Sequence, residues 1–183
     1  MAASNVTEDD SGSPEPHLPV FRAPRIRDGA KIHALVKNSA PLDVNSRYCY
    51  LVLCRYFFRT CVVAEEHNEI IGFISGFRPP LSDNVFFVWQ VAVDSQNRRR
   101  GLGKRMLHEL LHRPENSDIR FLETTVTPSN GASRLLFQSL AQDLDAPCKE
   151  SVCFSQEVFG SEAHEAEYLV RIGPFNIDNK EVK

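Results

Sequence analysis

The chain has 183 residues and a mass of 20.7 kDa, a length that fits one domain and is short for two. Apolar residues make up 42% and charged residues 25%, the proportions of globular proteins rather than of disordered or membrane proteins. The formal net charge is −3, so the chain lacks the overall positive charge typical of nucleic-acid binders, and we expect no nucleic-acid partner.

The negative charge is concentrated at the N-terminus. Residues 1–20 contain no Lys or Arg and carry four acids, Glu8, Asp9, Asp10 and Glu15. Three prolines and few apolar groups accompany these acids, so we expect a flexible acidic tail over residues 1–20. We expect the folded domain over residues 21–175 and a short C-terminal tail over residues 176–183.

No feature of the sequence indicates export or membrane insertion. The N-terminus lacks the basic start and apolar centre of a signal peptide, and no apolar run approaches the ~20 residues that cross a bilayer. The five Cys residues are an odd number without a CxxC pair, which favours free thiols in a reducing compartment over disulfides or zinc ligation. We therefore expect a cytoplasmic protein with no membrane partner.

The first part of the domain is expected to contain one strand and two helices. The strand covers residues 21–27, and Asp28 is the expected N-cap of the first helix. The expected buried face of that helix consists of Ile32, Leu35 and Val36. A second helix is expected over residues 46–58. Its apolar residues at helical spacing are Tyr48, Leu51 and Val52.

Two strands at residues 61–64 and 70–77 are expected to form a hairpin across a short polar turn. The next strand, residues 85–93, is apolar on both faces, so we expect it at the centre of a sheet with helices on each side. A third helix follows and ends before Pro114. Its expected inner face consists of Leu102, Met106, Leu107, Leu110 and Leu111.

A strand at residues 121–127 precedes a fourth helix, which Ser129 or Asn130 is expected to cap. The apolar stripe of this helix consists of Ala132, Leu136, Leu140 and Leu144. The final strands are expected at residues 152–154 and 167–172. This order predicts an α/β (α+β) domain with a mixed sheet flanked by helices, an architecture that does not by itself identify a function.

The segment after the expected central strand has the composition of an anion site. Gly101 and Gly103 open the third helix, where free backbone N–H groups and the helix dipole favour a pyrophosphate. Five cations lie around these glycines with no acid between them: Arg98, Arg99, Arg100, Lys104 and Arg105. A solvated basic helix start is the alternative interpretation.

Three phosphate-loop patterns compete for this segment. The dinucleotide-binding pattern G-x-G-x-x-G fails because Met106 stands at its third glycine. The P-loop pattern fails because Arg98 stands at its first glycine and Arg105 replaces its Ser or Thr. The third pattern, [R/Q]-x-x-G-x-[G/A], matches Arg98, Gly101 and Gly103. In this respect the segment resembles the acetyl-CoA signature of the GCN5-related N-acetyltransferases.

A second block supports this resemblance. A helix of the superfamily begins N-x-x-[AS]-x-x-L-[YF], and residues 130–137 read Asn-Gly-Ala-Ser-Arg-Leu-Leu-Phe. The resemblance implies a mixed central sheet of six to seven strands, about four flanking helices, and acetyl-CoA as co-substrate. The cofactor-binding residues it implies are Val91, Val93, Arg98, Arg99, Arg100, Gly101, Leu102, Gly103, Lys104, Asn130 and Ser133. Many members carry a Tyr as general acid where this chain has Phe137.

One further pattern is that of a zinc site. Residues 108–112 satisfy H-E-x-x-H, which on a helix can hold zinc in metalloproteases. Here His108 and His112 share the charged outer face of the expected helix, and the sequence offers no nearby third ligand. We therefore expect no metal.

Negative charge also gathers in residues 143–167, which carry seven acids and one Lys. Such a region would attract a cationic, amine-bearing acceptor, and a solvated acidic loop is the alternative. Glu123 lies inside an expected strand, where a carboxylate needs a partner. That partner is either an amine of the acceptor or a structural Arg.

Four longer blocks, residues 41–50, 88–94, 122–128 and 168–175, resemble one narrower family, the 2,4-diaminobutyrate acetyltransferases of ectoine biosynthesis. The likeness covers the whole expected domain. It implies transfer of the acetyl group of acetyl-CoA to the 4-amino group of L-2,4-diaminobutyrate. The product, N4-acetyl-L-2,4-diaminobutyrate, is the precursor of a compatible solute used against osmotic stress. The resemblance also implies a homodimer.

A small diamino acid needs acids for its amines and donors for its carboxylate. The expected substrate-binding residues are Asp43, Tyr48, Trp89, Glu123, Thr124, Thr125, His164 and Glu167. Glu167 is the expected catalytic base, with Glu123 as the alternative. Backbone N–H groups at residues 91–93 are expected to polarise the acetyl carbonyl. For each of these residues, a capping, core or surface role is the alternative.

We expect direct transfer in a ternary complex, without an acyl-enzyme on Cys49, Cys54 or Cys61. Two other functions stay open from the sequence. One is acetylation of another diamine, diamino acid or polyamine. The other is a non-catalytic CoA-binding module, which the absence of a proton donor at Phe137 would allow.

Overall fold

The computed structural model describes residues 18–40, 42–160 and 164–177. Most of the expected tails, residues 1–20 and 176–183, lies outside these ranges, so the domain boundaries stay predictions. Within the described ranges, no helix has the length and apolar character needed to span a membrane.

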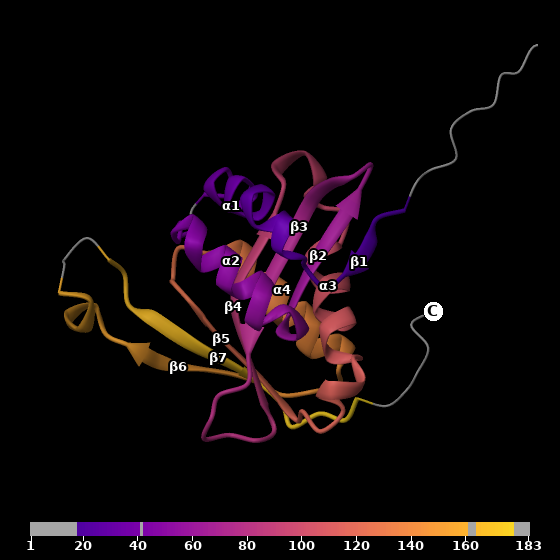
Figure 1. The fold of residues 1–183 in the computed structure, drawn as a ribbon. Coiled ribbons are helices and arrows are strands. Elements are labelled where there is room, and N and C mark those ends of the chain that lie inside the picture. The colour runs from indigo at the N-terminus through magenta and orange to yellow at the C-terminus, as the bar shows by residue number, and fades with distance from the viewer. Residues whose placement is uncertain (1–17, 41, 161–163, 178–183) are drawn as a thin grey trace, which may run out of the picture.

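In the part of the chain that the structure describes, seven strands form one mixed sheet in the order β1-β2-β3-β4-β5-β7-β6 (Figure 1). They are β1 (Val20–Arg22), β2 (Cys61–Glu66), β3 (Glu69–Phe77), β4 (Val85–Val93), β5 (Phe121–Val126), β6 (Cys148–Phe154) and β7 (Glu167–Ile172). All neighbours are antiparallel except β4 and β5, which are parallel. The expected mixed sheet of six to seven strands is confirmed, and β4 lies at its centre.

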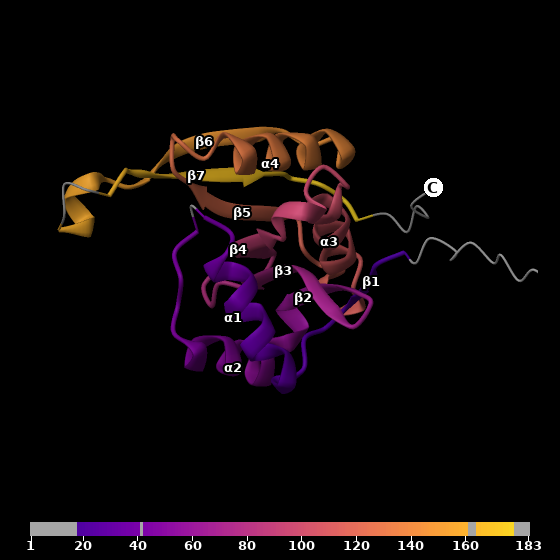
Figure 2. The same cartoon turned by 90° about the horizontal axis from the view of Figure 1, so that it is seen from above.

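Within the described ranges, four α-helices cover the sheet: α1 (Gly29–Lys37), α2 (Arg47–Tyr56), α3 (Leu102–Leu111) and α4 (Gly131–Asp143). Viewed from above, α1 and α2 lie on one side of the sheet and α3 and α4 on the other (Figure 2). Each pair has its own buried cluster, one between α1, α2 and strands β2 to β4, the other between α3, α4 and the opposite face. The helices therefore cover both faces of β4, as its doubly apolar sequence predicts.

The buried face of α2 differs from the expected one. Tyr50, Leu53 and Cys54 are buried, whereas Tyr48 is 75% exposed and Leu51 is 40% exposed. Both sets of residues have helical spacing, so the sequence pattern alone does not choose between them. Packing against α1 and the sheet determines which of the two faces of α2 is buried.

A similar shift occurs in α4. Its buried residues are Phe137, Leu140 and Ala141, and Leu136 is only partly buried against them. Ala132, which was expected in the apolar stripe, is exposed. The expected cap is confirmed, because the Asn130 side chain accepts a hydrogen bond from the Ser133 N–H at 3.1 Å.

The first strand is shorter than expected because a 3-10 turn, Ile26–Asp28, follows it. Asp28 is the N-cap residue of α1, as expected, but its side chain makes no capping hydrogen bond to that helix and caps the preceding 3-10 turn instead. Its carboxylate accepts a hydrogen bond from the Arg25 N–H at 2.7 Å and forms an ion pair with Arg22 at 2.7 Å. The strand expected at residues 152–154 is longer, since β6 begins at Cys148.

A bulge in β4 sets the geometry of the sheet centre. Gln90 pairs with Ser75, but Val88 pairs with Gly76, so Trp89 is an extra residue in β4. Val88, before the bulge, packs into the cluster beneath α3 and α4, and so does Val91, after it. Because these two residues are three apart rather than two or four, the bulge shifts by one residue which side chains of β4 point to each face of the sheet.

Near the same point β4 separates from β5. The parallel pairing runs only from Val85 to Val88 on β4 and from Phe121 to Thr124 on β5. Beyond Val88, the edge of β4 that faces β5 has no strand partner in the described sheet. An opening between the two central strands results.

The Arg22–Asp28 pair provides a test of the packing at the N-terminal edge. Burial opposes ionisation of Asp28, yet hydrogen bonds from Arg22 and from the Arg25 N–H outweigh it and hold the pKa of this carboxyl below its ordinary value. An acid with a lowered pKa stabilises the fold above its unfolded pKa, and this contribution is lost as the pH falls through its folded pKa.

We predict that Asp28→Asn lowers the free energy of unfolding by about 1–3 kcal/mol at pH 7, because it leaves the Arg22 charge with a weaker partner. Urea denaturation followed by circular dichroism measures this difference. It should shrink as the pH falls from about 4, the ordinary pKa of an Asp, through the lower pKa that this carboxyl has in the folded protein. Asp83→Asn, in an exposed loop, is the control and should have little effect. An equal loss from both variants would contradict the prediction.

Candidate active site

A pocket of about 210 Å³ lies beside the unpaired end of β4, between the first turns of α4 and the segment that follows α1. It is lined by Ser39, Ala40, Leu42, Val91, Val93, Arg98, Asn130, Ala132, Ser133 and Leu136. Five of these were expected to bind the cofactor, namely Val91, Val93, Arg98, Asn130 and Ser133. The structure thus brings together the end of β4, the loop that follows it and the first turn of α4.

Next to this pocket, the loop from β4 turns sharply into α3. Arg99 and Gly101 both have positive φ angles, 64° and 70°, and Gly101 is the N-cap of the helix. A Cβ on Gly103 would lie 3.3 Å from Leu136, so a glycine lets α3 pack closely on α4. The first turn of α3 contains no acid. Its free N–H groups and dipole form a site suited to an anion.

The basic residues of this segment have different partners. Arg98 lines the pocket, whereas Arg100 forms a two-point ion pair with Glu66, at 2.6 and 2.8 Å. Lys104 lies 2.9 Å from Asp143 of α4. The expected charge of +5 is therefore partly neutralised by protein carboxylates. Leu102 is 2% exposed, so only its backbone is available to a ligand.

Asp143 also contacts the H-E-x-x-H segment. Burial opposes ionisation of Asp143, but hydrogen bonds from Lys104 and His108 keep the pKa of this carboxyl below its ordinary value. His108 Nε2 lies 3.0 Å from Asp143, and His112 Nδ1 lies 2.8 Å from the carbonyl oxygen of His108. Within the described ranges, no group of three His, Cys, Asp or Glu residues is arranged to hold a metal.

On the α1–α2 side, the opening leads to a larger cavity of about 600 Å³. Trp89 and Thr125, two expected acceptor residues, belong to its wall. The lining is Cys49, Val52, Leu53, Phe57, Gly76, Phe77, Phe87, Trp89, Thr125 and Phe154. Most of these side chains are apolar, and apart from Trp89 and Thr125 none of them was expected to bind the acceptor.

The three expected acceptor residues of β5 divide between the two faces of the sheet. Glu123 and Thr125 are half-buried and share one face, whereas Thr124 is 4% exposed and lies on the other face with Leu122 and Val126. Because strand residues alternate, the sheet separates Thr124 from Thr125.

Glu123 has a partner within the protein. It forms an ion pair with Arg171, its cross-strand neighbour on β7. The Arg171 guanidinium also lies 4.1 Å from the centre of the Phe121 ring. Of the two partners considered for Glu123, a structural Arg is the one that the structure contains.

Glu167 is different, because its Oε2 atom is buried and has no hydrogen-bond partner among the described residues. It lies at the start of β7, on the same strand face as Arg171. Burial, and to a lesser extent the negative charges of Glu123 and Glu167, raise the pKa of Cys153. An unpaired, buried carboxylate oxygen is available to accept a proton or a hydrogen bond from a ligand.

Asp43 and His164 come together from distant parts of the chain. Asp43 Oδ2 lies 4.0 Å from His164 Nε2, and the His164 ring stacks on Phe159 with 3.8 Å between ring centres. The Asp43 side chain is 94% exposed. Tyr48 lies in the first turn of α2 and is also exposed.

Two polar residues behind Asp43 were not among the expected site residues. Gln90 donates a hydrogen bond from Nε2 to the Asp43 carbonyl oxygen at 2.8 Å, and the Tyr50 hydroxyl donates to Gln90 Oε1 at 3.3 Å. A glutamine inside an apolar strand was the available signal for this contact, because a buried amide needs hydrogen-bond partners.

The thiols near the opening are poorly suited to nucleophilic attack. Burial raises the pKa of Cys54 to about 11 and that of Cys61 to about 12. Burial also raises the pKa of Cys49, which lines the apolar cavity. A thiol that stays protonated near neutral pH is a weak nucleophile.

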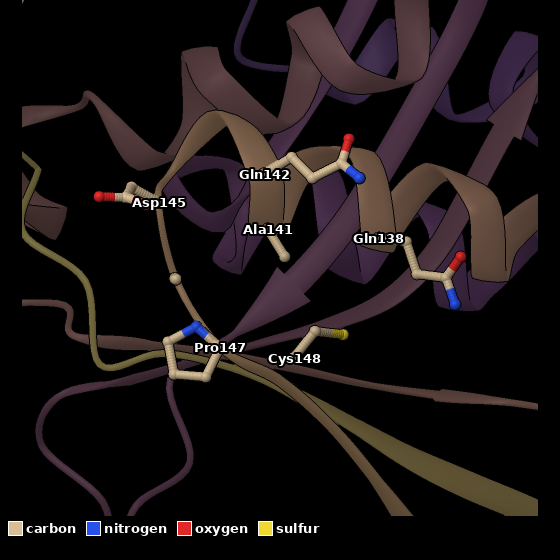
Figure 3. A pocket seen from close by; sticks show the side chains of 7 residues that line it. Gln138, Ala141, Gln142, Asp145, Pro147 and Cys148 are labelled. Carbon is tan, nitrogen blue, oxygen red and sulfur yellow. The ribbon is translucent and has the colours of Figure 1, made fainter.

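A third hollow, of about 610 Å³, lies at the other end of α4 (Figure 3). Gln138, Ala141 and Gln142 reach it from the helix, and Pro147 and Cys148 reach it from the segment that leads into β6. It contains none of the expected site residues.

Comparisons with known proteins find a matching family and similar chains. A model of the acetyltransferase (GNAT) family matches residues 31–141. The chain is 46% identical over 153 residues to the L-2,4-diaminobutyric acid acetyltransferase of Halalkalibacterium halodurans, covering 84% of this chain and 80% of the relative. It is 45% identical over 162 residues to the protein of the same description from Halomonas elongata, covering 87% and 84%.

A solved structure is also similar to this one. It is the diaminobutyrate acetyltransferase of Paenibacillus lautus in complex with its substrate L-2,4-diaminobutyric acid and coenzyme A. The two chains are 45% identical, the TM-score is 0.83, and the match covers 87% of this chain and 97% of the other.

The pocket between β4, α3 and α4 can be tested by filling it. Ser133 lies in the first turn of α4 and borders the pocket, so Ser133→Leu should occupy part of its volume. We predict at least a tenfold loss of affinity for CoA, measured by isothermal titration calorimetry, with little change in thermal stability. Gln142→Leu, on the same helix but at the third hollow, is the control. Unchanged CoA binding by Ser133→Leu would contradict this placement.

Proposed function

This chain belongs to the acetyltransferase (GNAT) family and, within it, to the L-2,4-diaminobutyric acid acetyltransferases, and we propose how it carries out their reaction. The acetyl group of acetyl-CoA is transferred to the 4-amino group of L-2,4-diaminobutyrate, a step of ectoine synthesis. The observation that supports this most is the opening between β4 and β5, which joins an anion-binding helix start to an acceptor side that carries an unpaired carboxylate.

The residues around the smaller pocket fit a CoA thioester. The N-terminus of α3, with Gly101, Gly103 and Arg98, receives the pyrophosphate of CoA. Asn130 and Ser133 border the part of CoA that connects the pyrophosphate to the sulfur. Of the other expected cofactor residues, Arg99 faces solvent, whereas Arg100 and Lys104 support the loop through their ion pairs.

The backbone of Val91 and Val93 lies at the unpaired edge of β4, beside this pocket. N–H groups directed from this edge stabilise the negative charge that develops on the acetyl oxygen during attack.

The acceptor amine must lose a proton before it attacks, since its ordinary pKa is about 10. Glu167 takes this proton, directly or through water, because its Oε2 atom is buried and unpaired whereas Glu123 is engaged by Arg171. Asp43 binds the second amine, and Trp89, Thr125, Tyr48 and His164 position the acceptor. Carboxylates near an amine also favour its charged form, so Asp43 assists binding more than deprotonation.

Transfer is direct: the amine nitrogen bonds to the acetyl carbon as the carbon–sulfur bond breaks, and the thiolate leaves with CoA. The raised pKa values of Cys54 and Cys61 disfavour an acyl-enzyme. Phe137 is 2% exposed within the α3–α4 cluster and has no proton to donate, so the thiolate obtains its proton from another source.

Glu167→Gln tests the role of the base. We predict that kcat with diaminobutyrate falls by about 10²-fold or more, while acetyl-CoA affinity stays within twofold, because the amide has no basic oxygen. Turnover is followed by release of the CoA thiol, and Glu157→Gln, an exposed nearby position, is the control. Near wild-type turnover would remove Glu167 from this role.

The same assay with a panel of amines tests the acceptor. Wild-type turnover should be higher with diaminobutyrate than with its longer and shorter homologues or with polyamines. Turnover only with another amine would replace the proposed acceptor, and CoA binding without any turnover would point to a non-catalytic module.

We further propose that the enzyme is a cytoplasmic homodimer that acts under osmotic stress. Free thiols at all five cysteines support a reducing compartment. In support of the dimer, β6 is an edge strand whose seven residues are all exposed, among them Val152 at 59%. Phe154 and the neighbouring Val158 are also exposed apolar residues. An exposed edge with apolar side chains is a surface suited to association.

Light scattering after size exclusion should give about twice the 20.7 kDa chain mass. We predict that Val152→Lys shifts this mass toward the monomer, because a charge would be buried at the interface. Val20→Lys is a matched control, since Val20 is 60% exposed on β1, the opposite edge strand. A monomeric wild type, or a dimer unaffected by Val152→Lys, would contradict the proposed β6 interface.

A further inference from the structure

Gln90 is a buried polar residue at the centre of the molecule. It follows the bulged Trp89 in β4 and is 6% exposed. Ala92, two residues on, packs in the α1–α2 cluster, so Gln90 is directed to the same side of the sheet. Burying an amide there is costly unless its hydrogen-bonding groups are satisfied.

Both ends of the Gln90 amide are satisfied by the α1–α2 layer. Its Nε2 donates to the Asp43 carbonyl oxygen at 2.8 Å, and its Oε1 accepts from the Tyr50 hydroxyl at 3.3 Å. The Tyr50 oxygen in turn accepts a hydrogen bond from the Asn45 N–H at 3.4 Å. Two points of the loop before α2 are thus attached to β4 through side-chain hydrogen bonds.

The anchor is itself rigid. Tyr50 is fully buried, and its ring makes edge contacts with His33 of α1 and Phe73 of β3, at 5.9 and 6.2 Å between ring centres. Gln90 lies in the middle of a nine-residue strand. The loop that carries Asp43 has no regular secondary structure, so these contacts determine where its backbone lies.

The Asp43 side chain needs such support. It is 94% exposed, and the ionic contact described for it is the 4.0 Å approach of His164. Its direction therefore depends on the position of its backbone. Gln90 fixes that position relative to Trp89, the adjacent residue, and so relative to the opening where the acceptor reacts.

We propose that Gln90 is a positioning residue for the acceptor: through the Asp43 carbonyl it holds the Asp43 carboxylate where it binds the substrate ammonium. This inference rests on the proposed function. Gln90 itself does not touch the acceptor. The specificity for a diamino acid then depends on a hydrogen bond inside the core as well as on the charged group at the surface.

A double-mutant cycle tests the proposal. Gln90→Met keeps the length of the side chain and removes both hydrogen bonds, and it should raise the KM for diaminobutyrate about tenfold, the effect of losing about one hydrogen bond. The kcat should change much less, and the affinity for CoA should stay within twofold. Asp43→Asn should also raise this KM. If Gln90 acts through Asp43, the double variant should resemble Asp43→Asn alone.

A second variant covers the case in which Gln90→Met does not fold. Tyr50→Phe keeps the Gln90–Asp43 hydrogen bond and removes the two made by the hydroxyl, so it should raise the KM for diaminobutyrate by a smaller factor. Thermal unfolding of each variant is measured alongside. A general loss of structure would lower kcat and CoA affinity together with acceptor binding, whereas the proposal requires the acceptor KM alone to move.

Each outcome has a defined meaning. An unchanged KM in Gln90→Met, or effects of Gln90→Met and Asp43→Asn that multiply in the double variant, would overturn the positioning role while leaving the proposed function in place. A wild-type enzyme that does not turn over diaminobutyrate at all would instead contradict the proposed function. Each KM of a folded variant is compared with the KM of the wild-type enzyme in the same assay.

Discussion

The early end of the pairing between β4 and β5 is the constraint on which the rest of the site depends. Two parallel strands held by hydrogen bonds along their whole length would leave no space at the centre of the sheet. Here the pairing ends at Val88 and Thr124, and the bulge at Trp89 shifts the side-chain alternation at the same place. One side of the opening then faces α3 and α4, and the other faces the α1–α2 layer.

Several charged side chains of this protein form ion pairs with one another rather than uniform charged surface patches. Asp143 and Glu150, from the acidic segment, pair with Lys104 and Arg134, and Arg100 pairs with Glu66 of the β2–β3 hairpin. The acidic segment is therefore only partly an attractive field for a cationic acceptor. What it offers chemically is local: a single carboxylate oxygen of Glu167 that is buried and unpaired among the described residues.

The sequence predicts most of the elements, and several of the residues that line the smaller pocket, because those features are local. The glycines at 101 and 103, the cap at Asn130 and the doubly apolar β4 each act within a few residues along the chain. The buried face of α2 and the partner of Glu123 are not local. Tyr48 and Tyr50 are equally apolar, and Arg171 lies 48 residues from Glu123, so only the folded sheet decides which residues meet. No residue type around Trp89 marks the bulge in the sequence. Simple alternation along β4 therefore does not predict to which face of the sheet Gln90 is directed.

The strand order has a consequence for how the enzyme is made. The last of the described strands, β7, lies between β5 and β6, so the sheet is completed by a segment that is synthesised after the other described strands. The loop that leads into α3 and the α4 cap precede it by 30 or more residues. A growing or truncated chain can therefore complete the pocket beside β4 and α4 while it still lacks Glu167 and the cross-strand support of Arg171. If Glu167 is the base proposed above, such a chain would bind the acetyl donor without being able to transfer its acetyl group.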